Sequence, residues 1–100
     1  MAGWDRKDVE RWMVQAERAD ARVRNPGEAK PLTWPGKYVV NKAERDALNL
    51  WIWCSARGYA FHEICVRRRH PYSTWLDRKN RAVGTIVMML NFEDLARKHG

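Results

Sequence analysis

Apolar positions recur at helical spacing along most of the chain. In residues 5–23 they follow the i, i+3, i+4 pattern of one helix face, and Asp5 is placed to cap the start. The opposite face mixes acidic and basic residues, which suits solvent and ion pairs one turn apart. The pattern predicts an N-terminal packing helix over 5–23; its wide apolar stripe, which includes Trp12, leaves a dimerisation helix as the alternative.

Residues 24–41 show no periodic pattern and contain several prolines and glycines, which interrupt helices and strands. The segments Asn25-Pro26-Gly27 and Trp34-Pro35-Gly36, together with Pro31, stop regular elements. We therefore expect a loop over 24–41, in which Trp34 and Tyr38 pin the chain onto the helices.

The next pattern, over residues 42–57, predicts a largely buried helix because its apolar residues lie on several sides. Asn41 and Glu44 have the form of a capping box at its start. Gly58 follows its last residue and can adopt the left-handed conformation that ends a helix.

Two further helical patterns meet at a proline. Residues 60–69 form a short pattern, Pro71 interrupts it, and a longer pattern covers 72–90. A short helix, a tight turn and a longer helix with a basic start have the outline of a helix-turn-helix, whose second helix can enter the DNA major groove. A last helix over 92–98, capped by Asn91, would follow. We expect four residues of this body to be buried together: Trp51, Ile64, Trp75 and Ile86.

Length and composition limit the architecture. One hundred residues, 45% apolar and with six Trp, can build one compact core of three or four helices but not two. The prediction is a single all-α domain over 1–100 with about four to five helices: the N-terminal helix, the Pro/Trp loop and a helix-turn-helix body over 42–91.

The positive charge is concentrated in the helix-turn-helix segment. The chain carries +7, and residues 57–81 hold seven basic and two acidic residues, a balance of +5. A solvated basic face would explain such a cluster. Because the cluster coincides with the predicted helix-turn-helix, however, a nucleic acid is favoured as the binding partner.

Other classes of protein fit the sequence less well. No apolar run approaches the ~20 residues that span a bilayer, and the charged start lacks the apolar region of a signal peptide, so we expect a cytoplasmic protein without a membrane partner. Cys54 and Cys65 fit apolar helix faces better than a zinc site with His62 and His70. No positioned nucleophile or carboxylate pair indicates an enzyme, and no motif indicates a cofactor.

The order of motifs resembles a family. A Trp4-x4-Val9-x2-Trp12 helix and a Pro/Trp loop precede Ala56, Gly58 and Glu63-Ile64-Cys65, and the basic helix ends in Ile86-x3-Leu90-Asn91. This looks like small uncharacterised phage and prophage proteins with a helix-turn-helix similar to region 4 of sigma factors. The resemblance implies a phage-type transcriptional regulator that acts in the host cytoplasm.

Candidate contacts with double-stranded DNA follow from the expected helix faces. If Trp75, Ala82 and Ile86 face the core, the opposite face carries polar residues suited to base edges, and arginines at the end of the preceding helix can reach phosphates. The candidate DNA-binding residues are Arg67, Arg68, Arg69, Tyr72, Ser73, Arg78, Lys79 and Arg81, with Asp77, Asn80 and Thr85 on the same face. A dimer is expected, because one helix-turn-helix gives little specificity. The alternative is a module that docks on host RNA polymerase or another host protein through Trp-rich surfaces.

Overall fold

The computed structural model describes residues 3–19 and 30–99, and all of its regular structure there is helical. The elements are α1 (Arg6–Arg18), the 3₁₀ helix η1 (Lys30–Thr33), α3 (Trp34–Tyr38), α4 (Lys42–Arg57), α5 (Phe61–Arg67) and α6 (Tyr72–His99). The described part contains no strand, so the predicted all-α class is confirmed.

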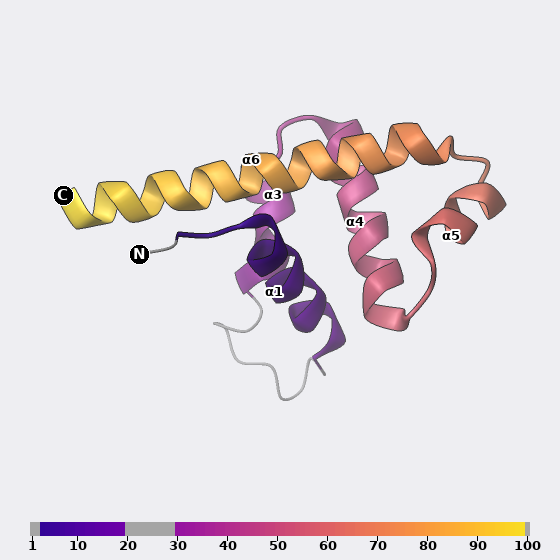
Figure 1. Cartoon of the computed structure of the whole chain (residues 1–100), viewed down its shortest axis with the longest axis horizontal. Helices are drawn as coiled ribbons and strands as arrows, with labels where there is room; N and C mark the ends of the chain where they lie inside the picture. The colour runs from indigo at the N-terminus through magenta and orange to yellow at the C-terminus, as the bar shows by residue number, and fades with distance from the viewer. Residues whose placement is uncertain (1–2, 20–29, 100) are drawn as a thin grey trace.

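The long helix α6 is the element on which the others are assembled. It has 28 residues, which corresponds to a length of about 42 Å. Figure 1 shows α1, α3 and α4 packed along α6, with α5 beside its N-terminal end. None of the described helices is both long and apolar enough to cross a membrane.

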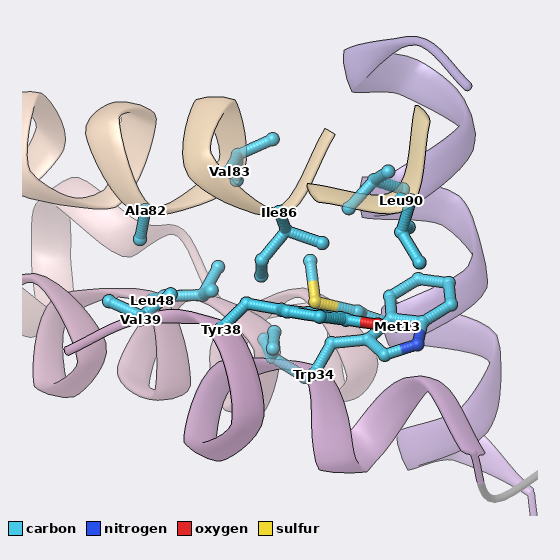
Figure 2. Packing of buried hydrophobic residues seen from close by; sticks show 11 residues of the cluster. Met13, Trp34, Tyr38, Val39, Leu48, Ala82, Val83, Ile86 and Leu90 are labelled. Carbon is cyan, nitrogen blue, oxygen red and sulfur yellow. The ribbon is translucent and has the colours of Figure 1, made fainter. Parts of the chain in front are cut away.

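The main core lies where α1, α3 and α4 meet the middle of α6. In Figure 2, Ile86 and Leu90 of α6 lie over Met13 and the rings of Trp34 and Tyr38. The buried members of this cluster are Val9, Met13, Trp34, Tyr38, Val39, Leu48, Ile52, Ala82, Val83, Ile86 and Leu90. The core therefore joins residues from both ends of the chain.

Local signals set several helix ends as predicted. The Asp5 carboxylate accepts the Asp8 backbone N–H at 2.8 Å, and the Asn41 side chain accepts that of Glu44 at 3.0 Å. Gly58 has φ +77°, the left-handed conformation that L side chains rarely adopt. The predicted helix over 42–57 is confirmed at both ends.

The first half of the chain differs from the prediction in two places. Helix α1 ends at Arg18 and Ala19 is extended, so the predicted extension of this helix is wrong at Ala19, and residues 20–23 lie outside the described residues. The predicted loop over 24–41 is wrong over 30–38, where η1 and α3 form; residues 24–29 are not described. Pro35 is tolerated because it sits in the first turn of α3, where a backbone N–H has no helical partner.

The predicted break before residues 92–98 is also wrong, because α6 continues to His99. Asn91 caps no helix. Its side chain accepts the Trp4 backbone N–H at 2.7 Å and donates to the Trp4 carbonyl at 3.0 Å. Gly3 lies so close that a Cβ there would be 2.4 Å from the Asn91 Oδ1. Asn91 therefore ties the N-terminal segment to α6.

The expected four-residue core is only partly formed. Ile86 is fully buried, as predicted. Trp51 is only half-buried, although it packs against the core. Ile64 and Trp75 are half-buried and lie outside the main cluster, so this prediction is wrong for both. Cys65 takes the buried position of the short α5. Trp75 instead stacks on His70, with ring centroids 3.8 Å apart and planes 9° from parallel.

Candidate nucleic-acid interface

The turn between α5 and α6 has a defined backbone geometry. Helix α5 ends at Arg67, and the next residues are Arg68, Arg69, His70 and Pro71. The His70 N–H donates to the Cys65 carbonyl at 2.8 Å, and the Arg69 N–H donates to the Val66 carbonyl at 3.1 Å. These two bonds form a Schellman motif, which satisfies carbonyls at the end of a helix. The turn thus fixes the point where α6 begins.

Arg69 occupies the left-handed position of this motif, with φ +58°. Glycine is usual there, because a Cβ makes the left-handed conformation unfavourable by about 1–2 kcal/mol. Arg69 therefore occupies a position whose left-handed backbone conformation favours glycine.

Aromatic contacts hold the turn against both neighbouring helices. The His70–Trp75 stack joins the turn to α6, and the Arg68 guanidinium lies 5.6 Å from the ring centroid of Trp53 on α4. At the start of α6, Tyr72 meets the His62 ring edge-on at 4.6 Å. These contacts set the direction of α6 relative to α5.

The predicted contact residues of the turn and of the first turn of α6 reach solvent together. Arg67, Arg68, Arg69, Tyr72 and Ser73 are all exposed, as their assignment to a free face requires. Their common exposure makes one basic surface at the α5–α6 junction, which we name the junction surface.

Three arginines of this region differ from the others in having no partner. The guanidinium groups of Arg67, Arg69 and Arg78 make no hydrogen bond or ion pair with any residue that the structure describes. Seven other described arginines have partners within the protein. Four bind carboxylates: Arg11 binds Asp8, Arg57 binds Glu17, Arg81 binds Asp77 and Arg97 binds Asp94. Three donate to other groups: Arg6 to Asn80, Arg18 to the Ser55 and Ala56 carbonyls, and Arg45 to the Val39 carbonyl. The junction surface therefore presents two guanidinium groups, those of Arg67 and Arg69, that are free to bind an anion, and the half-buried Arg78 adds a third on α6.

Further along α6, Arg81 is exposed and pairs with Asp77 at 3.1 Å, one helical turn away. Both side chains are more than half exposed, so the pair is worth only about 0–1 kcal/mol and exchanges readily. Asn80 accepts hydrogen bonds from Arg6 through its carbonyl and side chain, and the Thr85 hydroxyl donates to the Arg81 carbonyl. The Asn80 side chain is therefore engaged within the protein.

Among the predicted DNA-binding residues, Lys79 is the one that the structure buries, so it is not available to contact DNA. It is only 6% exposed, its ammonium pairs with the Glu10 carboxylate, and it lies 4.1 Å from the ring centroid of Trp51. The prediction was wrong because it followed charge rather than helix phase. Lys79 precedes Ala82, Val83 and Ile86 by three, four and seven residues, and that spacing already placed it on the buried face.

Among the side chains that the structure describes, the cysteines and histidines do not gather into a metal site. Cys54 and Cys65 are both completely buried, and burial is the main cause that raises the pKa of each thiol. The described residues contain no group of three or more His, Cys, Asp or Glu side chains that could hold a metal ion. The described cysteines serve packing.

A cleft of about 430 Å³ lies beside the turn, lined by Asp46, Asn49, Leu50, Trp53, Arg68, His70 and Trp75. Its aromatic walls are already engaged: Trp75 is stacked by His70, and Arg57 and Arg68 lie over Trp53. The cleft therefore offers polar edges rather than a free stacking surface.

Comparison with protein-family models, curated protein sequences and solved structures finds no significant match to this chain.

Proposed function

We propose that the chain binds duplex DNA through α5 and α6, which act as a helix-turn-helix. The observation that carries the proposal is the set of unpartnered arginines, Arg67, Arg69 and Arg78, in a protein whose other described arginines are largely paired. Arg67 and Arg69 are exposed and Arg78 is half-buried. Guanidinium groups without a partner in the protein are the usual ligands of phosphates and of guanine edges. The segment 57–81, with its balance of +5, supplies the electrostatic attraction.

The positions of the residues suggest how the contacts are divided. Arg67, Arg68 and Arg69 lie at the end of α5 and in the turn, so they contact the phosphate backbone and set the orientation. Ser73, Arg78 and Arg81 lie in the first three turns of α6, which enter the major groove. Because the Asp77–Arg81 pair is exposed and weak, Arg81 can exchange Asp77 for a base edge.

The test is the affinity for a labelled duplex as a function of salt concentration, measured by fluorescence anisotropy. We expect log K to fall linearly with log salt for the wild type. Arg67→Ala should weaken binding to all sequences and lower the slope by about one, whereas Arg78→Ala should cost about 1–3 kcal/mol on a preferred site. The matched control is Arg97→Ala, because Arg97 lies near the far end of α6 and pairs with Asp94. Weak binding to every duplex with no loss in either variant would refute the proposal.

Exposed apolar side chains beside the arginines favour a second candidate, a surface for an acidic protein such as a subunit of host RNA polymerase. Tyr59 is 51% exposed and Val66 is 61% exposed. Val66 precedes Arg67 in the sequence, and Tyr59 and Arg68 both contact the ring of Trp53. In this case Val66→Ser would weaken a protein complex as strongly as Arg67→Ala, and no steep salt-dependent binding to DNA would be observed.

A further inference from the structure

The face of α6 that points away from the core changes character along the helix. Residues three or four apart lie on one helix face, and one such series runs along the whole outer side. Its members are Thr74, Asp77, Arg81, Thr85, Met88, Phe92 and Leu95. The N-terminal members are polar or charged, whereas the last three are apolar.

These three apolar side chains are exposed. Met88, Phe92 and Leu95 are 61%, 65% and 57% exposed. Since a large apolar side chain has on the order of 200 Å² of surface, they expose on the order of 350 Å² together. Patches of this size on a monomer are often functional. We call Met88, Phe92 and Leu95 the apolar stripe.

We infer that a second copy of this chain covers the apolar stripe. The spacing of four and then three residues matches the d, a and d positions of a heptad, which is the pattern of a helix that pairs with another helix. Charge points to the same occupant. Each chain carries +7, but residues 82–100 contain two acidic and two basic residues. This half of α6 is therefore a place where two copies meet without net repulsion.

The charge distribution also selects an antiparallel arrangement. With Phe92 near the centre, Met88 of one copy contacts Leu95 of the second, and the helix dipoles oppose each other. The distance along the helix from Arg78 to this centre is about 20 Å, so the two basic segments lie about 40 Å apart along the pair. That is well beyond the Debye length of ~8 Å. A parallel pair would place two segments of +5 side by side.

The stripe predicts a weak dimer. Its area on each copy is about half of the ~800 Å² that a partner contributes to a standard interface, so flanking side chains such as Thr85 must add the rest. We expect a dissociation constant on the order of 10–100 µM.

Sedimentation equilibrium of the full chain over about 10 µM to 1 mM tests the dimer, and circular dichroism checks that each variant is folded. The wild type should pass from monomer to dimer, and Phe92→Ser should stay monomeric over the whole range. Val40→Ser is the matched control, because Val40 is 93% exposed and lies outside α6, and it should dimerise like the wild type. A wild type that is monomeric at about 1 mM, or a folded Phe92→Ser that dimerises undiminished, would overturn the inference.

Disulfide trapping tests the orientation. A mixture of Met88→Cys and Leu95→Cys chains should form mainly the mixed disulfide after mild oxidation, because these positions face each other only in the antiparallel pair. Predominant Met88→Cys homodimers would refute that arrangement. The native Cys54 and Cys65 are fully buried and stay out of the reaction. Neither measurement uses DNA, so the failure of this inference and the failure of DNA binding are separate results.

Discussion

Replacement of Lys79 by methionine tests whether this lysine stabilises the interior of the protein. Its charge alone would assign it to DNA binding. Its side chain is 8% exposed, and its ammonium is held between the Glu10 carboxylate and the Trp51 ring. Methionine keeps the apolar stem of the side chain and removes the charge. Because the Glu10 side chain is 23% exposed, water can reach it in part after its partner is lost.

The expected loss in the free energy of unfolding follows from the two contacts of the Lys79 ammonium. A hydrogen bond to a charged group contributes about 1.5–3 kcal/mol, and a desolvated cation–π contact contributes about 1–2 kcal/mol. The methionine recovers part of this through packing and through the desolvation that it no longer requires. We therefore expect Lys79→Met to lower the free energy of unfolding by about 2–4 kcal/mol, near the lower part of the range for breaking a buried ion pair.

The assay is urea unfolding followed by tryptophan fluorescence and circular dichroism. Glu10→Gln in the same chain should cost less than it does alone, because the two residues interact. The adjacent Arg78→Met is the matched control and should change the free energy of unfolding by less than about 0.5 kcal/mol. A loss below about 1 kcal/mol for Lys79→Met, or an equal loss for Arg78→Met, would refute the assignment of Lys79 to the interior. If folded Lys79→Met lost DNA affinity as strongly as Arg78→Ala, its exclusion from the interface would be wrong.

Three further predictions concern the turn, the N-terminal tie and pH. Arg69→Gly should raise the free energy of unfolding by up to about 1 kcal/mol in a urea titration, because glycine adopts the left-handed conformation without strain; a loss would mean that the side chain stabilises the turn. Asn91→Ala removes both bonds to Trp4 and should cost about 1–3 kcal/mol in the same measurement; an unchanged midpoint would contradict this tie. Burial, and next the hydrogen bond to Glu93, raise the pKa of Tyr38 above its usual value of 10.0, so its neutral form stabilises the fold fully below that pH and less as pH rises through the folded pKa. The stability advantage of the wild type over Tyr38→Phe should therefore shrink above pH ~10, and a constant difference up to pH ~12 would refute the cause.

The sequence by itself determined the features that depend on neighbouring residues. Asp5 and Asn41 cap helices through backbone groups three residues away, and Gly58 takes a conformation that its lack of a Cβ allows. Pro71 separates two helices for an equally local reason. The all-α class and the exposure of Arg67–Arg69 follow from the same short-range periodicity.

Tertiary structure decided which residues are buried and which charges are free. Packing against α1 and α6 makes short helices of 30–38 despite two prolines, and it holds Asn91 inside a continuous helix. Most of all, the sequence could not say which arginines have partners. Arg57 pairs with Glu17 across 40 positions, and Lys79 pairs with Glu10 across 69. An ion pair depends on distance in space, so only the folded chain shows that Arg67, Arg69 and Arg78 remain available for a ligand.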